Sequence, residues 1–155
     1  MIIGTSRNYA GRQVDLSIFP SQLQPGSPAI AEFSARPKAI AGPSRALQQF
    51  AIALLTPLGH YRSDPGYGSH FMPKVLSSEL RLTTDLDFLF IKESKRVLEW
   101  IATNRPANTP SDEILDDVSM LSSDITRTSV AIVGLAMLRT SEPVNFLLPI
   151  NWNPR

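Results

Sequence analysis

The stretch that decides the fold is an unbroken apolar run near the C-terminus, Val130-Ala131-Ile132-Val133-Gly134-Leu135-Ala136-Met137-Leu138. We predict that this run forms a strand, in which successive residues alternate between two faces. A strand in an antiparallel sheet with one wet face alternates apolar with polar residues. This run is apolar on both faces, so we expect both faces to be covered.

Two further strands flank this run and make the C-terminal region a small antiparallel sheet. The first contains Val118 and Met120 and is connected to the apolar run through residues 124–127. The last spans residues 144–150, after a Ser-Glu-Pro connection at 141–143. In this last strand Val144, Phe146, Leu148 and Ile150 alternate onto one face.

Two helices precede the sheet. Residues 44–56 carry apolar side chains at helical spacing, and Pro57 disfavours helical geometry at the residue before it. Residues 84–102 repeat that spacing over a longer stretch, with Asp85 and Asp87 at the end where the helix dipole favours acidic residues. We therefore predict an α+β domain over residues 43–155, with two main helices packed on a small C-terminal antiparallel sheet or hairpin.

The second face of the apolar strand requires its own cover, because two helices cover one face and leave little chain for the other. A partner subunit is one candidate, and a fold-back of the N-terminal segment is the alternative. Left bare, such a strand is an aggregation hazard. We predict that seven residues of this region contact a partner: Val130, Ile132, Val133, Leu135, Met137, Phe146 and Leu148.

Residues 1–42 differ from the rest of the chain because prolines recur throughout them. Proline fixes φ and removes a hydrogen-bond donor, so long helices are not expected here. Alternation at Val14, Leu16 and Ile18 permits one short strand. We predict an extended Pro-rich arm, either a flexible leader or a segment that becomes ordered on a neighbouring subunit.

Composition excludes several functional classes. The formal charge is +1 with no basic cluster, which argues against nucleic-acid or membrane-surface binding. There is no cysteine, so neither a disulfide nor a thiolate metal site can form. The apolar run at 130–138 is far shorter than the roughly 20 residues of a spanning helix. We expect a soluble protein with a charge-poor surface, since only 19% of residues are charged.

No residue set predicts catalysis, a cofactor or a metal site. His60 and His70 flank a glycine-rich loop that contains Asp64, but two histidines without a metal-binding motif favour ordinary loop residues. The loop glycines match neither a phosphate-binding loop nor a nucleophile elbow. Carboxylate pairs exist, but none lies in an apolar pocket pattern. We therefore predict that the chain is not an enzyme.

Three fragments, in this order, carry a family resemblance: Gly42-Pro43-Ser44-Arg45-Ala46-Leu47-Gln48-Gln49-Phe50, Leu54-Leu55-Thr56-Pro57-Leu58-Gly59, and Asp64-Pro65-Gly66-Tyr67-Gly68-Ser69 with Phe71. Together they resemble the baseplate wedge, or sheath-initiator, family of contractile phage tails, which includes the matching subunit of type VI secretion baseplates. Its members have a helix, these two loop motifs, a long helix and a terminal β-hairpin. The order of elements agrees over residues 43–150.

The resemblance implies a structural virion protein located in the tail baseplate and assembled in the host cytoplasm. In this family the subunit links the wedge to the tail sheath and templates the first sheath ring by strand addition. The implied partners are the tail sheath protein and other wedge subunits, with six copies per baseplate and neither nucleic acid nor membrane.

One departure and two alternatives accompany this resemblance. Many members carry Glu-Pro-Arg before the first late strand, where it helps docking, but residues 111–117 here read Ser-Asp-Glu-Ile-Leu-Asp-Asp. Glu113 is the nearest acidic residue, and the sequence assigns it no role. Some members have been labelled lysozyme-like, so a small cell-wall hydrolase is the first alternative. A soluble regulatory adaptor on the same fold is the second.

Overall fold

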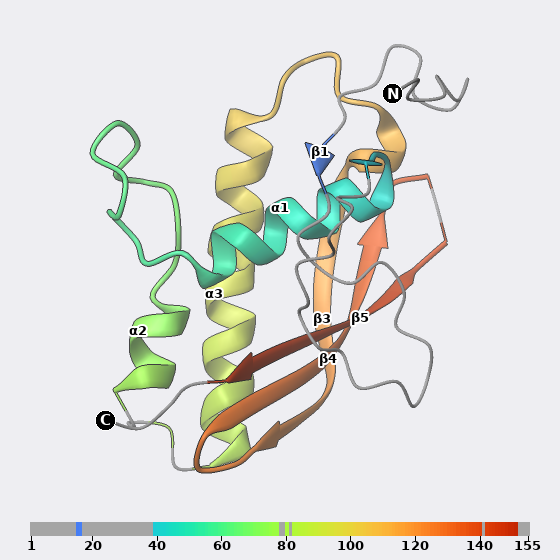
Figure 1. The fold of residues 1–155 in the computed structure, drawn as a ribbon. Helices are drawn as coiled ribbons and strands as arrows, with labels where there is room; N and C mark the ends of the chain where they lie inside the picture. Colours follow the sequence, from blue (N-terminus) through green and yellow to red (C-terminus); the bar gives the residue numbers. More distant parts are fainter. Residues whose placement is uncertain (1–14, 17–38, 78–79, 81, 141, 152–155) are drawn as a thin grey trace, which may run out of the picture.

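The computed structural model of the chain describes residues 15–16, 39–77, 80, 82–140 and 142–151. Figure 1 shows helices packed against a three-stranded antiparallel sheet, which confirms the predicted α+β fold. The described elements follow in the order β1 (Asp15–Leu16), β2 (Ala39–Ile40), α1 (Pro43–Leu55), α2 (Phe71–Leu76), α3 (Thr83–Asn104), the 3-10 turn η2 (Ser111–Glu113), β3 (Leu115–Ile125), β4 (Ser129–Leu138) and β5 (Val144–Asn151).

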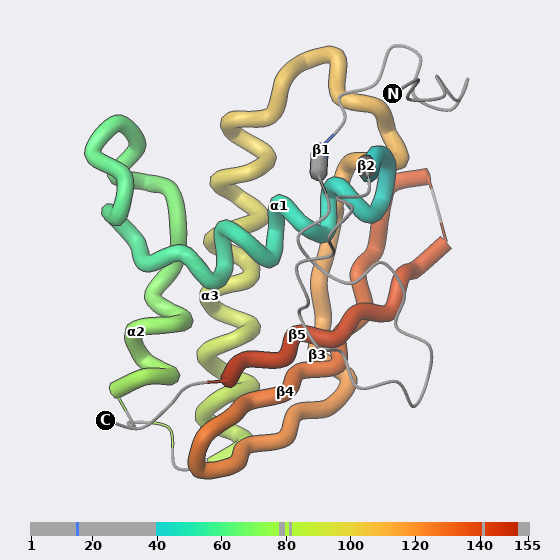
Figure 2. The backbone as a smooth tube through the Cα atoms, viewed as in Figure 1, coloured from blue at the N-terminus to red at the C-terminus, as the bar shows by residue number. Residues whose placement is uncertain are grey.

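Helices α1 and α3 match the two that the sequence predicts. Helix α1 begins with Pro43, whose fixed φ suits the first helical position, and ends at Leu55 ahead of Pro57. Helix α3 has 22 residues, and Asp85 in its first turn accepts a hydrogen bond from the Leu82 N–H (3.1 Å). The backbone trace in Figure 2 shows α1 crossing in front of α3. Both helices turn an apolar stripe inward.

The sheet has the order β3-β4-β5, so the apolar strand β4 is central and hydrogen-bonded on both sides. Ile132 faces Ser123 of β3 and Leu148 of β5. β3 runs to Ile125, which pairs with Val130, so part of the predicted connection at 124–127 belongs to the strand. The register shifts once between Leu115 and Asp117 and once between Met120 and Ser122, as β-bulges do.

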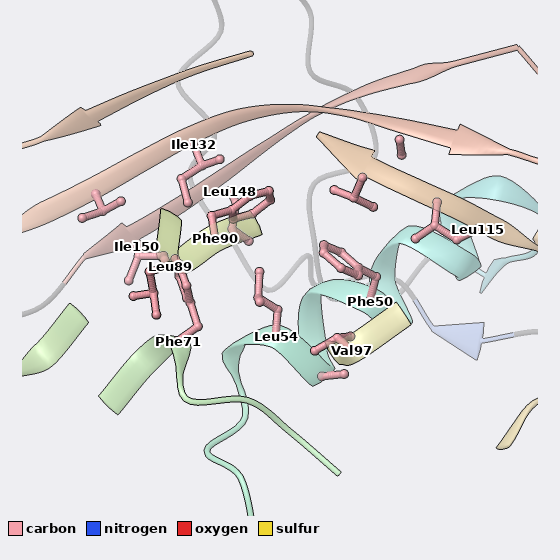
Figure 3. Packing of buried hydrophobic residues seen from close by; sticks show 14 of the residues in the cluster. Phe50, Leu54, Phe71, Leu89, Phe90, Val97, Leu115, Ile132, Leu148 and Ile150 are labelled. Atoms are coloured by element: carbon pink, nitrogen blue, oxygen red, sulfur yellow. The ribbon is translucent and has the colours of Figure 1, made fainter. Parts of the chain in front are cut away.

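The core lies between the helices and one face of the sheet. Figure 3 shows Ile132, Leu148 and Ile150 of the sheet directed toward the helical side chains. Phe50 and Leu54 of α1 and Phe90 of α3, all at most 1% exposed, meet them there, as do Phe71 and Val97. Burial of these large apolar side chains is the main force that holds the two layers together.

The described parts of the N-terminal segment belong to the fold. β1 pairs with β2 in antiparallel register, which confirms a short strand at Leu16, and Gln48 of α1 donates a hydrogen bond to Asp15. Ile40 is buried, so the packed domain includes residues just before the predicted boundary at 42/43. Most of the predicted arm, and therefore any fold-back over the sheet, lies outside the described residues.

Candidate interaction surface on the sheet

The two faces of β4 are equally apolar but differ in burial. Val130, Ile132, Ala136 and Leu138 form the inner face and are at most 6% exposed. On the outer face Val133 is 37% exposed and Met137 41%, while Ala131 and Leu135 are half-buried. Within the described residues, one side of this strand is therefore covered and the other is not.

The uncovered face continues onto β5 rather than β3. Val133 lies opposite Leu147 of β5, and Ala131 lies opposite Pro149. On β3, the strand on the other side of β4, the partners are polar. Ser119, Ser122 and Asp124 lie opposite Leu135, Val133 and Ala131. We define the outer patch as Val133, Leu135, Met137 and Leu147. It is an apolar area that is bordered by the polar residues of β3.

The seven predicted contact residues fall into two groups, one on the outer face of the sheet and one on its inner face. Val133, Leu135 and Met137 lie on the outer face, where a partner could reach them. Val130, Ile132 and Leu148 are at most 3% exposed and pack in the core. The predicted contact role of these three is corrected, because their side chains are already used to join the sheet to the helices.

Phe146 is also directed inward, so its predicted contact role is corrected as well. Its ring covers Gly134 of the neighbouring strand so closely that a Cβ atom at Gly134 would overlap it. The ring also meets Phe50 edge-on, with the centroids 6.4 Å apart. Phe146 therefore fills the space that a glycine leaves in the central strand.

The glycine-rich loop before α2 is held by backbone contacts. The Ser69 N–H donates to Thr56 O (2.8 Å), and the Leu58 N–H donates to Ser69 O (2.9 Å). Gly68 has φ +102°, and a Cβ atom there would lie 2.6 Å from Thr56 O. Only glycine fits such a position without strain, and these contacts hold the end of the loop against the residues that follow α1.

The possible metal and catalytic groups in this loop do not converge. His60 and His70 are exposed, and the His60 ring packs edge-on against Tyr61. Across the described ranges, no three His, Asp or Glu side chains are grouped closely enough to hold a metal ion. The Ser69 hydroxyl is buried and donates to the Leu54 carbonyl, and it also accepts from the Phe71 N–H.

Glu113 has a structural role that sequence reasoning missed. One carboxylate oxygen accepts from the Gly42 N–H (2.9 Å), and the other pairs with Arg45 Nη1 (2.8 Å). The carboxylate side chain is only 1% exposed. No sequence signal marks this role because the partners are 68 and 71 residues away. Glu113 is therefore enclosed by its own chain.

Glu93 is a second buried carboxylate, 2% exposed, and it accepts from the His70 N–H (2.8 Å) at the start of α2. A sequence signal does exist here. Glu93 lies between Phe90 and Val97 at the spacing of the buried stripe of α3, where an acidic residue needs a specific partner. It links α3 to the glycine-rich loop.

Two further carboxylates, Asp116 and Asp87, also have structural partners. Asp116 pairs with Arg139 across the sheet (2.7 Å) at an exposed position. This carboxylate raises the Arg139 pKa through a hydrogen bond and through its charge. Asp87 accepts from the Ser123 hydroxyl (3.2 Å) and thereby joins α3 to β3. Both carboxylates therefore join elements of the fold.

An aromatic cluster attaches the glycine-rich loop to the second half of α3. Tyr67 meets Trp100 edge-on at 4.9 Å and Tyr61 at 5.5 Å. Burial of the Tyr67 phenol, followed by the nearby Tyr61, raises its pKa above the usual 10.0.

Comparisons with known proteins add no family assignment. The chain matches no protein-family model, no curated protein and no solved structure. None of the helices in the described part of the chain combines the length and apolar character that a membrane span requires.

Proposed function

We propose that this chain is a structural subunit of a contractile-tail baseplate that links the wedge to the tail sheath. In this proposal it resides in the virion, after assembly in the host cytoplasm, and offers its sheet as a strand template for the first sheath ring. The proposal assigns no catalytic step to the chain. It rests on the sequence resemblance at residues 42–71 together with the surface of the sheet.

The observation that carries the proposal is the outer patch. Val133 and Met137 are more than a third exposed on the central strand, whose opposite face is buried. Covering apolar surface contributes about 25 cal/mol per Å² removed from water, so a partner that covers the patch gains stability from each of these side chains. A protein that functions as a free monomer gains nothing from keeping such a face apolar.

The local structure of the resembling fragments supports the same proposal. Residues 54–59 and 64–71 are separated only by residues 60–63, and hydrogen bonds between Ser69 and residues 56 and 58 join the two fragments directly. Gly68 and Ser69 are both buried at this junction. Motifs that meet in one structural unit are better evidence of a shared fold than separate short matches.

The test is the composition of purified contractile tails. In a host that expresses a tagged copy, the proposal predicts that the chain co-purifies with sheathed tails and lies at the baseplate end in immunogold images. Recovery only in the free protein pool would favour the regulatory adaptor instead. Clearing of peptidoglycan by the purified chain, lost on changing one carboxylate, would favour the hydrolase.

A further inference from the structure

A groove of about 550 Å³ runs between α3 and β3. Its helix wall consists of Thr83, Asp87, Ile91 and Lys95, which recur at every fourth residue and so share one face of the helix. Its other wall is the continuous stretch 117–123 of β3. Because strand side chains alternate between two faces, seven consecutive residues border one groove only where it follows the edge of the strand.

This edge of β3 has no strand partner in the described part of the chain, since β3 pairs with β4 alone. Backbone N–H and C=O groups along such an edge can accept another strand. The opposite edge of the sheet is less suited because β5 carries Pro149, which lacks an N–H. Residues 115–125 of β3 contain no proline.

The side chains around the groove specify the chemistry of an occupant. Ile91 is 46% exposed, and Leu121, at the bulge of β3, is 57% exposed. Both line the groove and offer apolar contacts. Asp87 and Asp117 outnumber Lys95 among its charged side chains, so the groove favours a segment with basic residues.

We propose that the α3–β3 groove binds an extended segment of a neighbouring protein by strand addition to the free edge of β3. The segment places apolar side chains on Ile91 and Leu121 and a basic side chain near Asp117. Main-chain hydrogen bonds supply the attachment, and the helix wall sets the register. The identity of the neighbour as a tail protein rests on the proposed function, whereas the binding mode does not.

The direct test titrates the isotope-labelled full chain with a synthetic peptide in which Val and Thr alternate between terminal lysines. Amide NMR shifts are expected at residues 117–123 and at Ile91. A second peptide of the same sequence, with N-methyl groups along one edge, cannot form the main-chain bonds and is expected not to bind. Equal binding of both peptides, shifts only along β5, or no binding at all would overturn the proposal.

A pair of variants on α3 separates groove binding from general surface effects. Ile91→Arg places a long cation in the groove and is expected to weaken peptide binding about tenfold. Phe88→Arg, on the same helix but outside the groove lining and 76% exposed, is expected to leave binding unchanged. Circular dichroism checks that both variants fold. If both variants bind the peptide as tightly as the unmodified chain, the groove is not the site.

The two proposals fail separately in this design. Absence of the chain from contractile tails would remove the proposed function but leave the peptide result intact. A chain that is present in tails and attaches sheath normally with Ile91→Arg would keep the baseplate function and exclude the groove as the point of attachment.

Discussion

Glu113 acts at the start of α1 as a capping residue that lies 71 residues after Gly42 in the sequence. Helix α1 has glycine at its N-cap position, so no capping side chain is available locally. The Glu113 carboxylate accepts from the N–H of that glycine and neutralises Arg45 in the first turn. A carboxylate at this position is also favoured by the helix dipole.

Removal of this carboxylate is expected to destabilise the whole domain. Glu113→Ala breaks a buried ion pair with Arg45 and removes the acceptor of the Gly42 N–H, which costs about 3 kcal/mol in the free energy of unfolding. Urea denaturation followed by circular dichroism measures the loss.

Asp116→Ala is the matched control, because it removes an acid paired with an arginine at an exposed site. Exposed pairs contribute little, so its urea midpoint is expected to stay close to that of the unmodified chain. Equal losses for the two variants would show that the burial of Glu113 does not matter.

Two glycines of the same loop are expected to differ in their tolerance of a methyl group. Gly68→Ala must fit a Cβ atom 2.6 Å from Thr56 O at a positive φ, so a loss of about 2 kcal/mol or more is expected. At Gly66 the nearest atoms would be 3.5 Å and 3.6 Å away, at ordinary contact distance. Thermal unfolding should therefore show a clear drop for Gly68→Ala and little change for Gly66→Ala. A drop of the same size in both would contradict the packing described for this loop.

At the scale of elements, the central strand depends on a glycine and an aromatic ring from the next strand. Gly134→Ala is expected to displace the Phe146 ring and to cost about 2 kcal/mol through overpacking. In a Phe146→Leu background the same change should cost at least about 1 kcal/mol less, because the ring that it displaces is gone. A double-mutant cycle by urea denaturation measures this coupling. Strictly additive effects would show that the ring and the glycine do not interact.

The main elements could be predicted from the sequence because α1, α3 and the strands of the C-terminal sheet carry regular patterns, whereas the short elements β2, α2 and η2 were not predicted. Helical spacing located α1 and α3 to within two residues at each end, and alternation located β5. What could not be predicted is which face of β4 turns inward. Both of its faces are apolar, so polarity gives no direction, and the choice depends on how β4 packs against helices that are distant in sequence. For this reason Val130 and Ile132 of β4 were included among the predicted partner contacts, together with Phe146 and Leu148 of the neighbouring strand β5.

The partners of the two buried carboxylates could not be predicted from the sequence either, because they also depend on contacts between distant residues. Glu93 breaks an apolar stripe and could have been recognised as a buried acid, but its partner, a backbone N–H of the loop, could not. Glu113 lies in a polar stretch that predicts solvent exposure. Its burial follows only from the approach of η2 to the start of α1, and no local pattern encodes that contact.

At the scale of the whole molecule, the helices pack against one face of the sheet. The other face is apolar, and no described residue covers its outer patch. The helices stabilise the inner face, whereas the outer patch adds no such packing to the isolated domain. In the proposed function this division separates folding from attachment. A substitution on the outer patch should therefore impair attachment while the domain remains folded.

The most direct measurement of that claim is sheath assembly on tails that carry Val133→Asp. Val133 is 37% exposed, so the charge can remain in water in the free domain, and circular dichroism should show both helices intact. The same substitution at Leu76, which is 52% exposed and belongs to α2 rather than to the sheet, is the control. We predict tails without sheath for Val133→Asp and normal sheaths for Leu76→Asp in electron micrographs. Normal sheaths on folded Val133→Asp particles would contradict the proposed attachment through the outer patch.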